Sequence, residues 1–561
     1  AATFSSLITR HQTSFNGVAS DWTFTNGNRT LTHTSGSSGD IMAAASQLLQ
    51  PGQKYHFEAV TESMHSSAYA RFALALVPQS MWETDASPLT GTNDQFTISL
   101  IKSGGTGSNS ATFDNGSLTA PTNKPTTNSR LTFEVDMSTI GSTTVRYYFN
   151  GSLDTTYSSL AFADEPYYVV SFTGTETDRN GVFNFNFGSS AFTDTPTSGH
   201  TGLTAKDAFA GSAPTIEDGS AHFQTTLYTG DNSSGRAIVQ TGNSQFQPDL
   251  VWLKARTQAR FHHLVDVVRG AGNTLQTNQN NAQGSNAPVT DFNSNGFDVT
   301  KNSDWDYNDS GTSELGWQWK AGGSASANNT GNVTVQLSAN QTAGFSIGTF
   351  NSGVQGSGIT LGHGLGAVPK MIWMKTSSAV TPWWVYFEDV GNTKYLQFGA
   401  SGNSTPATNA KVWRNTTPTS TIFTTSGEEG GSGWLADNQD NVFYAFAEIP
   451  GFSKFGAFTS GSSGNPFIEC GFTPALIFLK RTSANDDWYV QDTTRDPNNP
   501  AYRYLIWNTT ATEASNSNVF IDIISNGFVC DLSGIVTSND DMIFGAWASN
   551  PFAGTTPATA R

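Results

Sequence analysis

The chain of 561 residues contains 36% hydrophobic, 13% charged and 12% aromatic residues. Disordered chains are poor in aromatic residues and rich in charge, so this composition excludes disorder for most of the length. The net charge is -17 with 28 Lys+Arg and no basic stripe, which argues against binding to nucleic acid or to an anionic membrane surface. No apolar stretch is long enough for a membrane-spanning helix. No signal peptide is expected in this chain, which begins Ala1-Ala2.

The sequence predicts an all-β protein, because Gly, Ser, Thr and Asn separate short strand-like segments and helical periodicity is nearly absent. One short helix is expected over Ala43–Leu49, stopped by Pro51-Gly52. The alternation in Thr143–Asn150, followed by the turn pair Asn150-Gly151, is typical of an antiparallel hairpin. Such segments predict an antiparallel β-sandwich in residues 1–195.

An internal repeat occupies the rest of the chain. Pro248–Lys254 recurs as Pro369–Lys375 and as Pro474–Lys480, each with a proline, a spacer, four apolar residues and a lysine. This string predicts a buried strand that is entered through a rigid proline and whose lysine marks the return of the chain to water. The expected domains are residues 1–195, three related β-sandwich repeats at 196–321, 342–452 and 453–561, and a linker or added hairpin at 322–341.

Two shorter features refine this division. Ile449–Gly456 joins the second and third repeats and contains two phenylalanines, so we expect a packed joint there. Cys470 and Cys530 lie in apolar runs and are expected to be buried free thiols.

Five strings within residues 214–561 are distinctive: Pro248–Lys254, Asp266–Gly270, Leu361–Gly366, Ala445–Gly456 and Ala548–Phe552. Together they resemble tandem domains in tail-fibre and appendage proteins of tailed bacteriophages, including cyanophages and other marine phages. The N-terminal part is similar to the SPRY or concanavalin-like, lectin-like sandwich that often precedes such repeats, best at Phe183–Gly188. The first repeat departs from the pattern, with His262-His263 where the others have Trp.

The resemblance implies a structural protein of the virion, in a tail fibre or surface appendage, that contributes to attachment to the host surface. It implies a homo-oligomer, expected to be a trimer, with other virion proteins and a host cell-surface glycan as partners. The alternatives are a capsid-surface or connector component without recognition duty, a polysaccharide-degrading tailspike, and a free-standing bacterial lectin.

Four aromatic residues are candidates for stacking on sugar rings: Trp305, Tyr307, Trp383 and Trp413. Trp384 aligns with Trp488 of the third repeat, which indicates a core position. Trp383 lacks such a partner and is therefore the better candidate for an exposed ring, against the alternative that it too packs in the core.

Asp304, Asp306 and Asn308 form a candidate calcium site, because they place oxygen ligands at alternate positions. Asp309 stands where a calcium-binding hand needs glycine, so an Asx-rich turn is the competing interpretation. No other cofactor is expected.

The sequence predicts no enzyme, since it lacks the common catalytic motifs. The adjacent carboxylates Glu428-Glu429 and Asp486-Asp487 are expected to be solvated loop charges. His262-His263 with Asp266 resembles a metal cluster, but neighbouring residues of a strand face opposite sides, which favours packing roles.

Overall fold

Strands dominate the computed structural model, which confirms the all-β prediction. The structure describes residues 4–11, 22–25, 30–33, 41–64, 71–78, 96–101, 109–114, 116–173, 181–188, 191–203, 216–301, 307–353, 358–409, 411–426, 437–460, 467–516, 520–524, 526–531 and 539–551. The chain divides into two compact units, Ala1–Ala213 and Pro214–Arg561. Within the described ranges, no helix has the length and apolar character needed to cross a membrane.

The N-terminal unit contains two antiparallel sheets, as expected for a β-sandwich. In order, the first sheet contains β1 (Phe4–His11), β4 (Ile41–Leu49), β13 (Tyr167–Thr173), β6 (Arg71–Pro78), β7 (Phe96–Ile101), β8 (Ser110–Phe113) and β9 (Gly116–Leu118). The second contains β12 (Ser152–Leu160), β11 (Thr143–Phe149), β10 (Ser129–Asp136), β5 (Lys54–Met64), β14 (Gly181–Asn186), β3 (Thr30–His33) and β2 (Trp22–Thr25), with β15 (Thr201–Gly202) parallel to β5.

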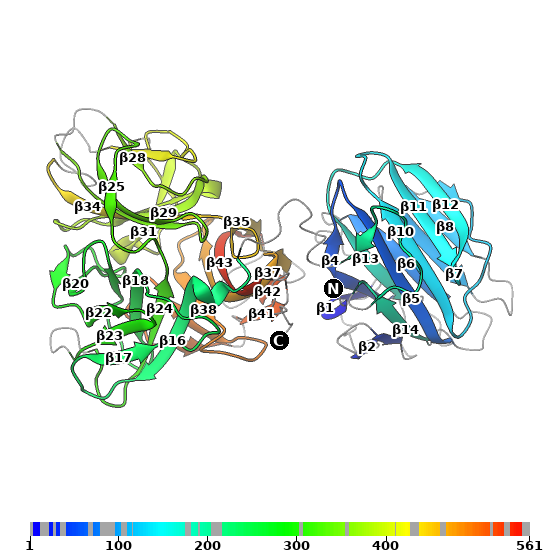
Figure 1. Cartoon of the computed structure of the whole chain (residues 1–561), viewed down its shortest axis with the longest axis horizontal. Helices are drawn as coiled ribbons and strands as arrows, with labels where there is room; N and C mark the ends of the chain where they lie inside the picture. Colours follow the sequence, from blue (N-terminus) through cyan, green and yellow to red (C-terminus); the bar gives the residue numbers. More distant parts are fainter. Residues whose placement is uncertain are drawn as a thin grey trace. The chain divides into compact units, whose positions relative to one another are not determined.

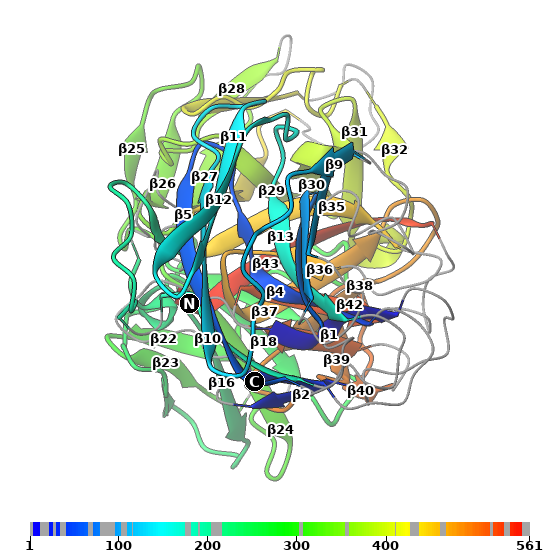
Figure 2. The same ribbon diagram turned by 90° about the vertical axis from the view of Figure 1, so that its right-hand side faces the viewer.

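Alternating side chains of the strands build the core of this unit. In the second sheet, β5, β10 and β11 lie beside one another (Figure 2). Phe57 and Phe133 pair across β5 and β10 and stack with ring centroids 5.4 Å apart. The helix predicted over 43–49 is wrong, because these residues belong to β4. Backbone ladders with β1 and β13 on both sides override the helical propensity of the alanine run.

The C-terminal unit contains three sheets that share one strand order. In copy one the strands are β16 (Phe223–Thr229), β24 (Ser313–Trp319), β18 (Leu250–Ala255) and β19 (His263–Asp266), continued by the pair β20 (Asn273–Thr274) and β21 (Gly284–Ser285). In copy two they are β27 (Phe345–Asn351), β34 (Asp440–Ala447), β29 (Pro369–Thr376), β30 (Trp383–Phe387), β31 (Lys394–Phe398) and β32 (Ala407–Thr408). In copy three they are β35 (Ser453–Thr459), β43 (Asp541–Pro551), β37 (Phe472–Arg481), β38 (Trp488–Asp492), β39 (Arg503–Ile506) and β40 (Ala514–Ser515).

A smaller sheet accompanies each of these copies. The smaller sheets contain β17 (Arg236–Val239), β23 (Gly296–Val299) and β22 (Val289–Asn293) in copy one, β28 (Ile359–Gly362) and β33 (Ile422–Thr425) in copy two, and β36 (Phe467–Glu469), β42 (Gly527–Asp531) and β41 (Phe520–Ile524) in copy three. The hairpin β25 (Ser326–Asn328) and β26 (Val335–Asn340), within residues 322–341, extends the large sheet of copy two beside β27. Among the described residues, the 3-10 turns are η2 (Gly219–Ala221), η3 (Glu388–Val390) and η4 (Gly399–Ser401).

The three copies meet in one hydrophobic core and form the green, yellow-green and orange-to-red lobes of this unit (Figure 1). The repeated string is a buried strand in each copy, as predicted, and its aromatic residue is Trp252, Trp373 or Phe478. The rings of Trp252 and Trp373 lie 5.5 Å apart, and Trp507 lies 4.7 Å from Trp252 and 5.1 Å from Phe478. The core therefore belongs to the three copies jointly.

The predicted joint between copies two and three is packed, since Phe452 and Phe455 are buried. Cys470 and Cys530 are buried free thiols, also as predicted.

The lysine of the repeated string does not return to water, so that prediction is wrong. Lys254, Lys375 and Lys480 are all fully buried. Their Nζ atoms donate to backbone carbonyl oxygens, including Ala255 O and Thr376 O at 2.8 Å. Each lysine fixes the loop that follows its strand, and burial lowers the pKa of Lys254 to about 8, of Lys375 to about 7 and of Lys480 to about 8.

Candidate functional site

The interfaces between copies, here called seams, form a closed cycle: one–two, two–three and three–one. A ring nitrogen at one register position faces a backbone carbonyl in each seam. The pairs are Trp383 Nε1 with Gln276 O (2.8 Å), Trp488 Nε1 with Gln397 O (3.1 Å) and His262 Nε2 with Ile506 O (3.0 Å). A head-to-tail contact that recurs three times and returns to its start is a closed heterologous ring within one chain.

His262 can donate the same hydrogen bond as the two tryptophans because its tautomer is fixed. Trp252 Nε1 donates to His262 Nδ1 at 2.8 Å, so the remaining proton of the imidazole lies on Nε2 and points to Ile506 O. Burial lowers the pKa of His262 well below its ordinary value, which keeps the ring neutral.

Strand register also corrects the matching of the repeats. Trp383, not Trp384, is equivalent to Trp488, because Trp384 and Tyr489 lie opposite Met374 and Leu479 at the next position. The alignment of the repeats by sequence was one residue out in copy two, because Trp383 and Trp384 are adjacent and identical.

A buried aspartate and arginine, spaced as Asp-x-x-Arg, hold the three–one seam. Asp492 accepts hydrogen bonds from Arg495 Nε at 2.5 Å and, across the seam, from Trp317 Nε1 at 3.2 Å. The side chains of Asp492 and Arg495 are fully buried. Arg495 also lies over the Trp317 ring, 5.8 Å from its centroid.

The one–two seam repeats this arrangement. Asp266 pairs with Arg269 at 2.6 Å, and Tyr444 of copy two donates its hydroxyl to Asp266 at 2.7 Å. Trp317 and Tyr444 occupy the same register position, opposite Trp252 and Trp373. The sequence analysis missed both pairs, although aligning the repeats a few residues further would have revealed the common Asp-x-x-Arg spacing.

The two–three seam is apolar at these positions. Phe387 and Val390 replace the aspartate and the arginine, and Gly545 replaces the tryptophan or tyrosine. A Cβ atom on Gly545 would lie 2.3 Å from the ring of Phe478, so the glycine is required by close packing. The residues on both sides of the two–three seam are therefore apolar where those of the other two seams are polar.

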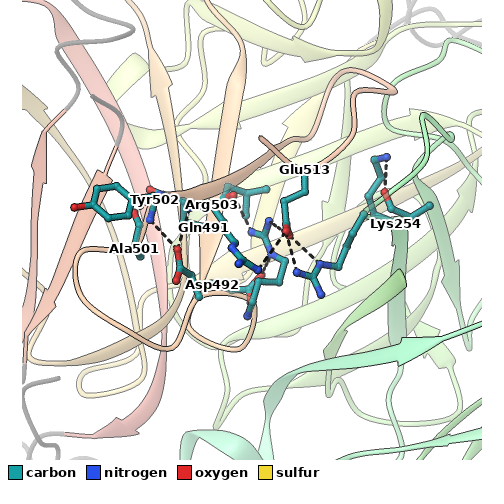
Figure 3. Close-up of polar contacts among 12 residues, drawn as sticks. Lys254, Gln491, Asp492, Ala501, Tyr502, Arg503 and Glu513 are labelled. Atoms are coloured by element: carbon teal, nitrogen blue, oxygen red, sulfur yellow. Dashed lines mark hydrogen bonds and ion pairs between the residues drawn. The ribbon is translucent and has the colours of Figure 1, made fainter. Parts of the chain in front are cut away.

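Outside this buried layer, the three–one seam holds a carboxylate among three guanidinium groups (Figure 3). Arg256 donates to both oxygens of Glu513, at 2.9 and 2.8 Å. Arg495 lies 3.4 Å and Arg503 3.9 Å from the same carboxylate. Although burial opposes ionisation, the guanidinium groups of Arg256 and Arg495 lower the pKa of Glu513.

A backbone hydrogen bond reinforces two of the seams at this outer layer. Glu513 N donates to Arg256 O at 2.8 Å, and the equivalent Gln283 N donates to Ser377 O at 2.7 Å. In the two–three seam the equivalent donor position is Pro406, which has no N–H group.

A groove of about 400 Å³ lies at this position of the two–three seam. Copy two contributes Val390, Lys394 and Pro406, and copy three contributes Phe458, Thr482 and Asp541, among other residues. Lys394 and Asp541 are exposed, while Phe458 is half-buried. The groove therefore combines an apolar wall with charged and hydroxyl groups, as small-molecule sites do.

None of the three described aromatic residues predicted to bind glycan lines this groove, and the fourth lies outside the described residues. Tyr307, Trp383 and Trp413 are almost completely buried, so none of them offers a face to a sugar. Trp305 lies outside the described residues. These three side chains are buried because they fill the cores of the sandwiches and, for Trp383, the one–two seam.

The calcium candidate is only partly described, because Asp304 and Asp306 lie outside the described residues. The Asn308 side chain is buried, with Oδ1 accepting from Asp231 N and Nδ2 donating to Ser233 O. Among the described residues, no group of three or more His, Cys, Asp or Glu side chains is placed to hold a metal ion.

The remaining candidates have structural partners. His262 and His263 are both buried and face opposite sides, the seam and the interior of copy one, as strand geometry predicts. Asp486 accepts from the Tyr489 hydroxyl at 2.9 Å, and Asp487 accepts from Asn508 Nδ2 at 2.8 Å. Glu428-Glu429 lies outside the described residues.

These features define an all-β protein in which a two-sheet sandwich is followed by a closed ring of three similar sheets. The chain belongs to the family described as "Domain of unknown function (DUF7483)", whose model matches residues 218–551.

Solved structures with similarity to the chain include SPRY and lectin domains. The SPRY domain of human HERC1 is 16% identical (TM-score 0.24), covering 34% of this chain and 99% of its own. The potassium-bound carbohydrate recognition domain of Emp46p is 9% identical (TM-score 0.23), covering 32% and 94%. A lectin from Bauhinia forficata in complex with GalNAc is 13% identical (TM-score 0.21), covering 32% and 96%. No curated protein sequence matches the chain.

Proposed function

We propose that the chain is a structural protein of a tailed-phage virion, in a tail fibre or surface appendage, which contributes to attachment to a host-surface glycan. The observation that supports this most is the closure of three copies into one block by buried polar and aromatic seams. Such a block is stiff, because each copy is held by two neighbours, and stiffness suits a component that transmits force between a particle and a cell.

The strings that resemble tail-fibre and appendage proteins also support the proposal. Asp266–Gly270 contains the ion pair of the one–two seam, and Ala445–Gly456 contains the joint between copies two and three. The resemblance therefore coincides with the contacts that build the ring.

The proposed role is non-catalytic and virion-associated. The buried carboxylates of the seams, Asp266, Asp492 and Glu513, are each bound by an arginine and so are poorly suited to exchange protons with a substrate. The proposed homotrimer uses surfaces other than the seams, since the seams are already occupied within one chain.

The test is to measure the mass of the native assembly and then its adsorption to marine cyanobacteria and marine heterotrophic bacteria. The proposal expects a defined oligomer that coats some of these cells and releases no reducing sugar from them. A monomer that adsorbs to none of the cells would overturn it, and sugar release would replace it with the tailspike alternative.

A further inference from the structure

The side chains of the outer layer differ sharply between the three–one seam and the two–three seam. In the three–one seam this layer is filled by the side chains of Arg256, Arg495, Arg503 and Glu513. Strand pairing makes these residues equivalent to Thr482, Val390, Lys394 and Pro406 in the two–three seam, in that order. All four of the latter line the groove.

The replacements at Thr482, Val390 and Pro406 remove side-chain volume or a hydrogen bond from the two–three seam. Thr482 and Val390 are much shorter than arginine, and Pro406 supplies neither a carboxylate nor the N–H group that bonds Arg256 O in the other seam. The backbone frame is nevertheless retained, since Trp488 still donates to Gln397 O and Asp486 N to Asn403 O at 2.7 Å. The groove is thus a position that the ring fills elsewhere with its own side chains and leaves open here.

The chemistry of the opening suits a molecule with an apolar face and polar edges. Val390 and Phe458 offer apolar surface, and an aromatic ring packs well against the C–H face of a sugar ring. Around them, Asp389 and Asp541 supply acceptors for hydroxyl groups, and Lys394 supplies a donor. In the three–one seam the same volume holds arginine side chains, which likewise combine apolar stems with polar ends.

We propose that the groove of the two–three seam binds one pyranose unit of a surface polysaccharide. This deepens the proposed function and rests on it, because that function requires a glycan without placing its site. Two carboxylates against one ammonium group in the lining disfavour acidic sugars, so the expected unit is neutral or N-acetylated. The volume of about 400 Å³ lies at the small end of ligand sites, which agrees with a single ring rather than a long oligosaccharide.

The decisive variant grafts the filled seam onto the open one. In the full-length chain, Thr482→Arg combined with Pro406→Glu introduces the arginine and the carboxylate of the three–one seam, with Lys394 in the place of Arg503. The matched control is Ser377→Arg, which introduces the same arginine side chain at the equivalent position of the one–two seam. The probes are the methyl glycosides of glucose, galactose, mannose and N-acetylglucosamine, followed by saturation-transfer NMR.

Wild type and the Ser377→Arg control are expected to bind at least one of these glycosides, and the double variant to bind it at least tenfold more weakly. Circular dichroism and thermal unfolding establish that the double variant is folded. If no glycoside binds to wild type, or if the folded double variant binds as well as wild type, the inference is overturned.

Cell adsorption separates this inference from the proposed function. If wild type coats cells and the double variant coats them equally well, the groove is not the site, although attachment stands. If wild type coats no cell but still binds a glycoside in the groove, the saccharide site stands and the attachment role fails.

Discussion

The three–one and two–three seams join the same two faces of the same repeat, yet one is filled with charge and the other is apolar inside and open outside. In the three–one seam, Asp492 and Arg495 are buried against Trp317, and Glu513 closes the outer layer. In the two–three seam, Phe387 and Val390 face Gly545. The ring nitrogen-to-carbonyl contact is common to both. A hydrogen bond to a backbone carbonyl therefore fixes how neighbouring copies pack. The side chains on the two sides of a seam can then differ between seams, provided that they change together.

Breaking the buried pair of the three–one seam is expected to have the largest effect. Asp492→Ala leaves the fully buried Arg495 with only the more distant Glu513 carboxylate and Trp317 without its acceptor, so the free energy of unfolding should fall by about 3–5 kcal/mol. Denaturant titration followed by tryptophan fluorescence measures this, because most of the 14 Trp residues lie in the C-terminal unit.

A matched variant copies the apolar seam. Asp492→Phe, Arg495→Val and Trp317→Gly together reproduce Phe387, Val390 and Gly545, and should be more stable than Asp492→Ala alone. A triple variant less stable than the single one would show that the two side-chain sets are not interchangeable between seams.

The converse change tests the apolar seam. Gly545→Ala places a Cβ atom 2.3 Å from Phe478 and 3.0 Å from Phe455, so overpacking should lower the free energy of unfolding by about 1–3 kcal/mol. The control is Gly456→Ala on the neighbouring strand, which like Gly545 has no positive φ but whose new Cβ atom lies 3.0 Å from the nearest atom, in the ring of Phe544. Equal losses in the two variants would mean that Phe478 does not need the space at Gly545.

The one–two seam adjoins Lys375, whose pKa of about 7 lies below that of an unfolded lysine, near 10.5. Between these values the unfolded state binds a proton that the folded state lacks, so raising the pH favours folding. The free energy of unfolding should rise between pH 7 and pH 10, with Lys375 contributing up to about 1.4 kcal/mol per pH unit. Lys375→Met should make this rise shallower, while Lys254 and Lys480, whose pKa values are lowered to about 8, still contribute to it. An unchanged slope would show that Lys375 stays protonated in the fold.

The smallest effect is expected at the missing backbone bond. Pro406→Ala restores an N–H group at the position where Gln283 and Glu513 donate across their seams. A net gain of about 0.5–1.5 kcal/mol from the bond is offset by about 0.4–1 kcal/mol of added unfolded-chain entropy, so stability should barely change. Hydrogen exchange should instead find the new amide of residue 406 as protected as those of 283 and 513. A fast-exchanging amide would mean that side chains, and not the proline, hold the seam apart.

The sequence by itself determined the all-β class, the recurring strand with its proline, the packed joint at Ile449–Gly456 and the burial of both cysteines. These follow from local patterns, since strand alternation and proline punctuation depend on residues close together in the chain. Only the tertiary structure decided that Ile41–Leu49 is a strand, that the three lysines of the repeat are buried, and that Trp383 faces a seam rather than solvent. The groove, too, depends on contacts such as Arg256 with Glu513, 257 residues apart, and on their replacement at Thr482 and Pro406. Such pairings arise when distant segments pack together, and no local pattern records which side chains will meet.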